Sequence, residues 1–398
     1  MRVIGLISGT SMDGIDAAVG DLEFDERGVV LRPLGSISVP YSPALRDSLE
    51  RALPPASTTA EEMCRLDNAV GQAFGEAARE AAGAVDAGDA DLVVSHGQTV
   101  FHHVEDGRVL GTLQIGQPAW IAEATGLPVV ADLRTRDVAV GGQGAPLVSM
   151  FDVLLLAGSE EPVAALNLGG IANLTIVSAG SDPVGFDIGP ANALIDAAVQ
   201  HVTGGKERFD RDGLMAGRGR VDPSLLDRLR ADPYYQRPHP KTTGKELFNL
   251  SYLLEVLENA EDPASVRMAP EDLVATVTAL TAVTVAEACQ AHRVTRVIAA
   301  GGGTANPVLM SMLEAQLPSV TVAPIDELGV PSGAKEAYAF ALLGFLTVHN
   351  LPGNVPPVTG ATRAVVLGSV VPGRKGFPQA RTVEAPPDRL RIAFGGDA

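Results

Sequence analysis

The chain has 398 residues, of which 46% are hydrophobic and 20% are charged, a composition typical of a globular protein with room for two domains. Its 30 Lys and Arg residues against 48 Asp and Glu residues give a net charge of −18, which argues against non-specific binding to nucleic acids and against docking to anionic membranes. Neither of the two cysteines lies in a metal-binding or redox spacing, and we recognise no signal peptide or transmembrane run, so a reducing cytoplasm is the expected location.

The first predicted element is a hairpin. An apolar, β-branched strand at 3–7 is followed by a turn of small residues and a returning strand at 15–22. The segment from Gly9 to Asp16 presents backbone N–H groups and hydroxyls to one point, where a nucleotide phosphate fits. Asp13 and Asp16 place carboxylates beside that point, as expected if a divalent cation accompanies the phosphates. Taken alone, the pattern is also compatible with an ordinary polar hairpin.

Two polar segments follow predicted strands at 91–95 and 127–131. The first, at 95–99, contains His96, which could hydrogen-bond a sugar hydroxyl, serve in acid–base chemistry or satisfy a loop backbone. The second, at 132–137, brackets Arg134 and Arg136 with aspartates before the glycine loop at 141–144. These arginines could hold an anion bidentately or form a solvated ion-pair turn.

A second hairpin is predicted at 163–177, where an apolar strand, the turn Gly169-Gly170 and a return strand repeat the N-terminal pattern. The two hairpins look like one element used twice, although glycine turns between strands also recur by chance. Further along, Asp187 stands before Gly189-Pro190, which opens a helix. A carboxylate fixed there is well placed to act as a general base, and an N-capping aspartate is the alternative.

The C-terminal half continues the alternation of helices and strands that is typical of an α/β fold. A helix is predicted after Pro270, and a strand at 296–300 leads into the glycines at 301–303 and then Asn306-Pro307. Three glycines allow close approach of a flat ring or a phosphate, which suits an adenosine site, although such a turn is weak evidence alone. Another helix is predicted at 334–346, and a Pro- and Gly-rich surface tail is expected near the end of the chain.

Together these segments resemble the anhydro-N-acetylmuramic acid kinases, a branch of the actin-like, hexokinase-like sugar kinase superfamily. The resemblance runs in the family's order from residue 3 to about residue 370. Its motifs are at 5–14, 95–99, 114–116, 131–134, 141–148, 167–170, 185–192, 209–213, 241–246, 301–306, 352–354 and 358–361. Mild departures occur at Gln117, Ala191 and Thr242, where the family often has Asn, Gly and Ser.

The resemblance implies a two-domain actin-like ATPase fold of the α/β, ribonuclease H-like type, with a duplicated phosphate-binding hairpin and an interdomain cleft. We expect an N-terminal domain at 1–131, a C-terminal domain at 132–370 and a surface tail at 371–398. The small-molecule partners implied are ATP, with Mg²⁺ held mainly through its phosphates, and an anhydro-amino-sugar. No nucleic acid or membrane partner is expected, and the sequence is compatible with a homodimer.

The implied activity is an ATP-dependent kinase that opens the internal bridge of 1,6-anhydro-N-acetylmuramic acid and leaves a phosphate on O6. Two alternatives stay open at this point. One is a kinase for another sugar or anhydro-sugar on the same fold, and the other is a non-catalytic actin-like nucleotide-binding regulator.

The resemblance and the local patterns together give a set of expected site residues, in which Asp187 is the general base. The residues expected to contact the sugar are Ser95, His96, Gln98, Arg134, Asp187 and Glu336, the last of which could instead be a solvated first-turn glutamate. The residues expected to contact ATP are Gly9, Thr10, Ser11, Met12, Asp13, Gly14, Ile15, Asp16, Gly169, Gly170, Asn173, Gly301, Gly302, Gly303 and Asn306.

Overall fold

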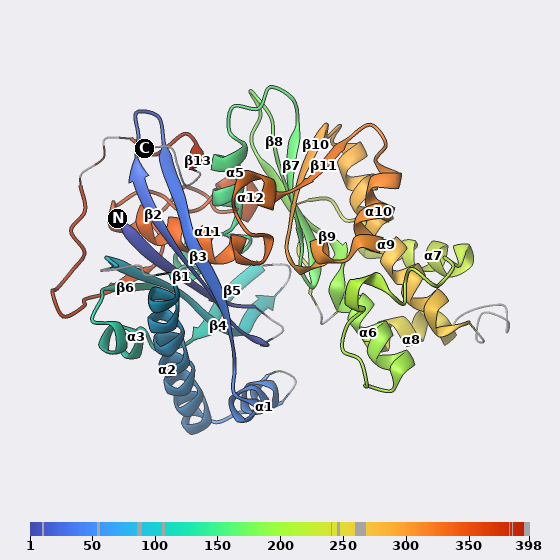
Figure 1. Ribbon diagram of the computed structural model, residues 1–398, viewed down its shortest axis with the longest axis horizontal. Helices are drawn as coiled ribbons and strands as arrows, with labels where there is room; N and C mark the ends of the chain where they lie inside the picture. Colours follow the sequence, from blue (N-terminus) through green and yellow to red (C-terminus); the bar gives the residue numbers. More distant parts are fainter. Residues whose placement is uncertain are drawn as a thin grey trace. The chain divides into compact units, whose positions relative to one another are not determined.

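The computed structural model describes residues 1–9, 12–53, 56–85, 90–105, 108–239, 241–244, 247–258, 268–381, 383 and 385–393. The chain divides into two compact units (Figure 1): unit 1 comprises Met1–Ala157 and Leu328–Ala398, and unit 2 comprises Gly158–Glu327. This division differs from the boundaries predicted at residues 131 and 370. Residues 132–157 pack with unit 1, and the chain returns to unit 1 after residue 327, because its last long helix and its last two strands pack on or pair with the sheet of that unit.

Among the described residues, eight strands form the sheet of unit 1, here called sheet A, in the order β12-β6-β4-β1-β2-β3-β13 with β5 attached to β4. β1 pairs antiparallel with β2 and β2 with β3, whereas β4 runs parallel to β1 and β6 parallel to β4. The bounds are β1 (Arg2–Ser8), β2 (Gly14–Phe24), β3 (Val29–Pro40), β4 (Leu92–Glu105), β5 (Arg108–Ile115), β6 (Val129–Ala131), β12 (Ser369–Val371) and β13 (Leu390–Ile392).

The described part of unit 2 contains a five-stranded sheet, here called sheet B, in the order β11-β10-β7-β8-β9. Its strands are β7 (Val163–Leu168), β8 (Ile171–Val177), β9 (Val184–Pro190), β10 (Arg296–Ala300) and β11 (Thr321–Pro324). An antiparallel meander is followed by two parallel strands on the other side of its first strand, as in the run β3-β2-β1-β4-β6 of sheet A. The duplicated hairpin and the α/β architecture predicted from the sequence are therefore confirmed.

The described helices of unit 1 are α1 (Pro43–Ala52), α2 (Ala60–Ala84), α3 (Pro118–Thr125), α4 (Thr135–Ala139), α5 (Ser149–Leu156), α11 (Lys335–Val348) and α12 (Pro356–Thr359). Those of unit 2 are α6 (Asn192–Thr203), α7 (Pro223–Arg230), α8 (Leu250–Glu258), α9 (Pro270–Ala291) and α10 (Pro307–Gln316). Short 3-10 turns are η1 (Arg211–Gly213), η2 (Pro233–Gln236), η4 (Gly302–Ala305), η5 (Ile325–Leu328) and η6 (Ser332–Ala334).

Helices α2 and α11 cover opposite faces of sheet A (Figure 1). Ile4 and Leu6 of β1 share a core with α2, whereas Gly5 between them faces α11, as the alternation of a strand requires. A Cβ atom on Gly5 would lie 1.9 Å from the carbonyl oxygen of Ala337, so only glycine lets α11 approach this strand so closely.

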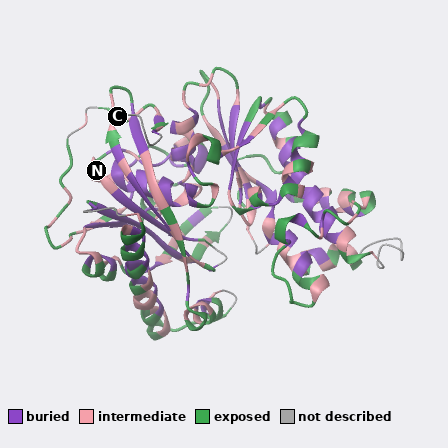
Figure 2. Ribbon diagram, viewed as in Figure 1, coloured by how far each residue is buried: buried purple, intermediate pink, exposed green. Residues whose placement is uncertain are grey.

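The core of unit 2 lies between sheet B and the helices α6 and α9, and Figure 2 shows the central strands of both units as buried. α9 is apolar and long enough to cross a membrane by length and composition, but 78% of its most apolar window is buried inside the structure. Its apolar residues therefore serve as the centre of a globular core.

The segment 371–398 was expected to be a surface tail, and it instead carries β13 of sheet A, while β12 ends at its first residue. β12 pairs antiparallel with β6 at one edge, and β13 pairs parallel with β3 at the other edge. β12 pairs with all of β6, whereas β13 pairs only with Val29, Val30 and Leu31 of β3, so the backbone groups of these residues are not left unpaired at the edges.

Candidate functional site

The turn after β1 is fixed by backbone geometry. Met12 N donates to Gly9 O at 3.2 Å, and Met12 has a φ of 52° while its side chain is only 5% exposed, so it anchors the turn in the core. Gly14 and Ile15 already belong to β2, where a Cβ on Gly14 would lie 2.4 Å from Val39 O. Thr10 and Ser11, which the sequence predicts to contact ATP, lie outside the described residues.

Gln98 ties this turn to β4. Its side chain is fully buried, and its Oε1 lies 2.7 Å from Ser8 Oγ. Its Nε2 donates to Gly9 O and to Thr99 O, at 3.2 Å in each case. Both ends of the amide are thus engaged inside unit 1, so the observed contacts of Gln98 hold the turn in place.

The two aspartates of the turn have different surroundings. The side chain of Asp13 is 65% exposed and pairs with Arg46 at 2.8 Å. Burial raises the pKa of Asp16, which lies in β2, while a hydrogen bond with Ser38 lowers it. Within the described ranges, no group of three or more His, Cys, Asp or Glu residues could hold a metal ion.

Arg134, which follows β6 and is half-buried, pairs with His96, which is buried within β4. Arg134 Nε donates to His96 Nε2 at 2.8 Å, and His96 Nδ1 lies 2.9 Å from Gly97 O. Because Nε2 accepts, the ring proton must reside on Nδ1, which then donates to the carbonyl. Burial, together with the charge of Arg134, lowers the pKa of His96 to about 3, so the imidazole is neutral at pH 7.

Arg134 also binds the glycine loop at 141–144 and interacts with the charges of two carboxylates. Its Nη1 donates to Gly144 O at 2.6 Å, and the nearby charges of Glu336 and Asp137 favour its protonated form. Burial nevertheless lowers the pKa of Arg134 to about 10, which leaves the guanidinium charged at neutral pH. The two hydrogen bonds of Arg134 go to His96 and Gly144, and among the described residues neither Arg134 nor Arg136 is seen in an ion pair with Asp132 or Asp137, so the solvated ion-pair turn that the sequence left open is not observed.

Ser95, which lies beside this pair in β4, is almost fully buried. Its Oγ has no hydrogen-bond partner among the described residues. A buried hydroxyl without a partner is uncommon in a folded protein.

In unit 2, Asp187 lies within β9, opposite Asn173 of β8. Its Oδ2 accepts a hydrogen bond from Thr243 N at 3.0 Å, and its backbone oxygen accepts one from Tyr234 Oη at 2.7 Å. α6 begins only at Asn192, so Asp187 is not its N-cap, and the alternative interpretation of this aspartate is excluded.

The segment 241–244 supplies this environment. Lys241 O accepts from Asp187 N at 3.0 Å, and Lys241 Nζ donates to Tyr234 O and Tyr235 O at 3.3 Å and 3.2 Å. Burial lowers the pKa of Lys241, while the charge of Asp187 raises it. The sequence motif at 241–246 was recognised, but no role was predicted for it; its residues 245 and 246 lie outside the described ranges.

The second glycine turn contacts the start of α6. Gly170 O accepts hydrogen bonds from Ala191 N at 2.9 Å and Ala193 N at 3.0 Å, and Gly169 O accepts one from Asn192 N at 3.1 Å. The carbonyl groups of the turn therefore accept hydrogen bonds from backbone N–H groups at the N-terminal end of α6.

The glycines at 301–303 serve two purposes. A Cβ on Gly301 would lie 2.6 Å from Asn167 Oδ1, and one on Gly303 would lie 2.7 Å from Leu168 Cβ, so these two let η4 pack on β7. Gly302 has nothing within 4 Å of that position and is the open member of the triplet.

Asn306 caps α10. Its Oδ1 accepts hydrogen bonds from Val308 N and Leu309 N, each at 3.1 Å. The residue predicted to contact ATP therefore has an observed structural contact through its carbonyl group.

The predicted residues thus fall into two clusters, one at the end of each sheet where the parallel strands finish. The cluster of unit 1 comprises Gly9, Met12, Asp13, Gly14, Ile15, Asp16, Ser95, His96, Gln98, Arg134 and Glu336. The cluster of unit 2 comprises Gly169, Gly170, Asn173, Asp187, Gly301, Gly302, Gly303 and Asn306. Ligands of open α/β sheets bind at such ends.

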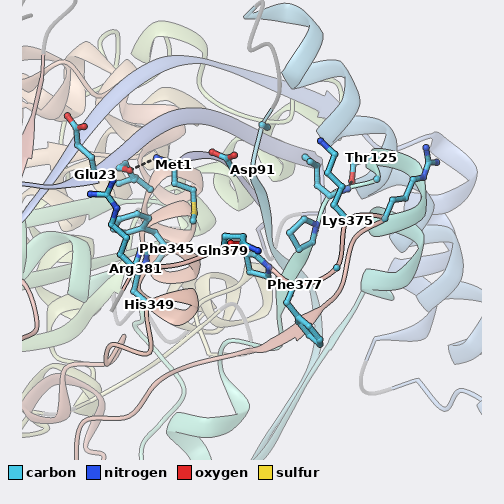
Figure 3. A pocket seen from close by; sticks show the side chains of 18 of the residues that line it. Met1, Glu23, Asp91, Thr125, Phe345, His349, Lys375, Phe377, Gln379 and Arg381 are labelled. Atoms are coloured by element: carbon cyan, nitrogen blue, oxygen red, sulfur yellow. Dashed lines mark hydrogen bonds between the residues drawn. The ribbon is translucent and has the colours of Figure 1, made fainter. Parts of the chain in front are cut away.

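A pocket of about 920 Å³ lies at the opposite end of sheet A (Figure 3). Met1, Asp91 and Pro128, which precede or begin the parallel strands β1, β4 and β6, line it together with the segment 374–379. It contains none of the predicted residues, so its size alone does not mark it as the functional site.

Comparison with known proteins gives a consistent result. The model of the anhydro-N-acetylmuramic acid kinase family matches residues 1–373. The anhydro-N-acetylmuramic acid kinase of Streptomyces coelicolor is 58% identical over 395 residues, which cover 99% of this chain and 100% of that protein. The protein of the same name from Rhodococcus erythropolis is 53% identical and covers 98% of this chain and 99% of its own length.

Among solved structures, the chain is similar to a ROK family glucokinase from Streptomyces griseus in complex with glucose and AMPPNP. The sequence identity is 15% and the TM-score is 0.38, with 86% of this chain and 99% of that chain covered.

Proposed function

Since this chain belongs to the anhydro-N-acetylmuramic acid kinase family, we propose that it uses ATP and water to convert 1,6-anhydro-N-acetylmuramic acid into N-acetylmuramate 6-phosphate and ADP. The observation that carries this proposal is the match over nearly the whole chain, at an identity of 58%. The reaction belongs to peptidoglycan recycling and amino-sugar catabolism.

Asp187 is proposed as the general base. It would take a proton from the water that attacks C1, and the C1–O6 bond would break with its electron pair moving to O6. O6 would then attack the γ-phosphorus of ATP, and the bond from that phosphorus to ADP would break. The hydrogen bond from Thr243 N to Asp187 Oδ2 supports this role, because it orients the carboxylate and favours its charged form.

Arg134 and Glu336 are proposed to bind the sugar. The guanidinium of Arg134 is charged and is held by two hydrogen bonds, which suits recognition of the lactyl carboxylate. Glu336 is in the first turn of α11, where its carboxylate could accept bonds from sugar hydroxyls or the amide N–H. His96 would act through Arg134, because both of its ring nitrogens are already engaged. Ser95 remains a proposed contact.

The nucleotide is proposed to use the glycine turns of both sheets. The turn at Gly9 would receive phosphate oxygens, and Gly302 would allow close approach of the adenosine. A divalent cation that arrives with ATP would spread the charge of the transferred phosphoryl group. We place the enzyme in the cytoplasm, where ATP is available, and its two cysteines, Cys64 and Cys289, are free.

The test is a reaction in ¹⁸O-labelled water with ATP and the anhydro-sugar, followed by mass spectrometry of the product. We expect one labelled oxygen at C1 and a phosphate on O6. A kinase for an ordinary sugar hydroxyl would give a phosphorylated product without the label. A nucleotide-binding regulator would give no phosphorylated sugar at all.

A further inference from the structure

Asp137 is a fully buried carboxylate with no assigned role. Its Oδ2 accepts a hydrogen bond from Gly144 N at 2.8 Å. Its Oδ1 accepts two more, from Asn354 Nδ2 at 2.7 Å and from Thr359 Oγ1 at 2.8 Å. Burying a carboxylate costs free energy unless such donors compensate. A carboxylate buried with three donors therefore indicates a structural or functional role for Asp137.

The donors come from the other end of the chain. Asn354 and Thr359 lie 217 and 222 residues after Asp137, within the motif at 352–361. The same two segments are also joined by backbone bonds, from Gln143 N to Thr359 O at 2.8 Å and from Thr362 N to Val140 O at 2.9 Å. The buried carboxylate of Asp137 thus lies where hydrogen bonds join the glycine loop at 141–144 to the C-terminal motif at 352–361.

The glycine loop is shaped around this carboxylate. A Cβ on Gly142 would lie 2.1 Å from Asp137 Oδ2, so a side chain at this position would displace the carboxylate. The backbone also closes on itself, because Gly142 N donates to Asp137 O at 2.9 Å. The position of Gly144 is therefore set by Asp137 and not by the loop alone.

Gly144 is in turn the residue that holds Arg134. Its N–H is bound by Asp137, and its carbonyl oxygen accepts from Arg134 Nη1 at 2.6 Å. With Arg134 Nε fixed by His96 at 2.8 Å, two bonds define the plane of the guanidinium. Its Nη2 makes no hydrogen bond to a described residue, so that edge can meet a carboxylate.

We propose that Asp137 is a positioning residue which, through Asn354, Thr359 and Gly144, sets the orientation in which Arg134 reads the substrate's carboxylate. This inference rests on the proposed function, since it assigns the lactyl carboxylate to Arg134. It also gives the motif at 352–361 a role in specificity without contact with the ligand.

The experiment measures dissociation constants by calorimetry for two sugars: the anhydro-muramic substrate and the anhydro-glucosamine analogue, which lacks the lactyl carboxylate. The variants are Thr359→Val, which removes one donor from the carboxylate while keeping the shape, and Asp137→Asn, which removes its charge. Thr359→Ser restores the hydroxyl. The matched control is Thr278→Val in α9, a buried threonine whose Oγ1 donates to Val274 O at 2.8 Å and which belongs to unit 2, whereas Arg134 belongs to unit 1.

We expect Thr359→Val to weaken binding of the muramic sugar by about fivefold or more while binding of the analogue changes little, and Thr359→Ser to recover the preference. Thr278→Val should lower the melting temperature to a similar degree and keep the preference. Folded Thr359→Val and Asp137→Asn proteins with the wild-type ratio of the two constants would overturn the inference. A wild-type protein that binds neither sugar would instead overturn the proposed function.

Discussion

The hydrogen bond from Arg134 Nε to His96 Nε2, 2.8 Å long, joins the side chains of two residues of the predicted sugar set. It fixes the histidine as the Nδ1–H tautomer and makes it a neutral acceptor. The imidazole is therefore a support for a cation and is not available for proton transfer through either nitrogen.

The first prediction concerns acid stability. The pKa of His96 is lowered to about 3 in the folded protein, against an ordinary value of 6.5. Between these two pH values the imidazole is protonated in the unfolded chain and neutral in the folded chain. Stability is unaffected above pH 6.5 and falls as the pH drops from 6.5 towards 3. On going from pH 7.5 to pH 5.5, His96 alone should lower the free energy of unfolding by about 1.4 kcal/mol.

The measurement compares urea unfolding at the two pH values for wild type and His96→Gln. We expect the variant to lose less stability on acidification, by about that amount. His103→Gln, at a half-buried position of the same strand, serves as the control and should behave as wild type. Equal acid losses in wild type and His96→Gln would show that the buried imidazole does not resist protonation.

The second prediction is that Asp187→Asn abolishes most turnover and leaves ATP binding nearly intact. An amide cannot accept the proton of the attacking water, so kcat should fall by about a hundredfold or more. Asp182→Asn, an exposed aspartate just before β9, is the matched control and should keep wild-type activity. Near-wild-type turnover in the Asp187→Asn protein would refute the assignment of the base.

The elements with a strong apolar pattern could be predicted from the sequence. Continuous apolar runs correctly predicted the strands β1, β7 and β10, and an apolar pattern that starts after Pro270 correctly predicted the helix α9. The predicted helix at 334–346 corresponds to α11, and Gly344 does not break it. A Cβ there would lie 2.1 Å from Val94 Cγ2, so the glycine serves packing against β4.

Other elements depend on partners that local sequence does not reveal. The strand predicted to stop at Ser95 continues to Glu105 as β4, because Gly97 adopts a φ of 72° inside it and β5 pairs with the extension. Neither β3 nor β9 was predicted, β12 (Ser369–Val371) lies at the predicted boundary between the C-terminal domain and the tail, and β13 lies in the segment expected to be a tail. These strands are specified by pairing with neighbours in the sheet.

The same distinction applies to the site. Motifs located its members, but the contact between Arg134 and His96 links residues 38 positions apart and could not be derived from spacing. Asp137 was interpreted as part of a charged turn. It is buried because its donors come from residues 354 and 359, which only the folded chain brings to it.

The third prediction concerns the first glycine turn. A Cβ at Gly9 would meet nothing within 4 Å, so Gly9→Val should fold normally. If phosphates approach the backbone here, the added side chain should weaken binding of a non-hydrolysable ATP analogue by about tenfold or more. Gly111→Val, at another glycine with nothing within 4 Å, is the control for calorimetry. Unchanged affinity in a folded Gly9→Val protein would give the turn another role.

The fourth prediction concerns the ion pair between Lys335 Nζ and Asp152 Oδ1, 2.6 Å long, whose side chains are only 2% and 5% exposed. Burial raises the pKa of Asp152, and the lysine offsets this. Asp152→Asn leaves a buried ammonium without its counter-charge and should destabilise the protein by about 3 kcal/mol.

The double variant Lys335→Met/Asp152→Leu removes both charges and should recover most of that stability in thermal unfolding. Asp227→Asn is the control, because Asp227 is 75% exposed and pairs with Arg230 at 3.6 Å, and such pairs contribute little. If Asp152→Asn and the double variant unfolded at the same temperature, the loss of stability in Asp152→Asn would come from lost packing and not from an unpaired charge.

The last prediction concerns the preference for the muramic over the glucosamine form of the anhydro-sugar. The lactyl carboxylate meets a protein with a net charge of −18, so a local cation must outweigh a repulsive field that salt screens over roughly 10 Å. Arg134 is half-buried and held by two hydrogen bonds, whereas Arg136 is exposed on α4. Arg134→Gln should therefore raise KM for the muramic substrate by about tenfold and narrow its preference over the analogue, while Arg136→Gln should leave both unchanged. Steady-state kinetics with the two sugars separates these outcomes from a general loss of activity, which would lower both values of kcat/KM in proportion. If both variants kept the wild-type preference, backbone amides or solvent would have to carry the recognition, and the role of the Asp137 network in specificity would fall with that of Arg134.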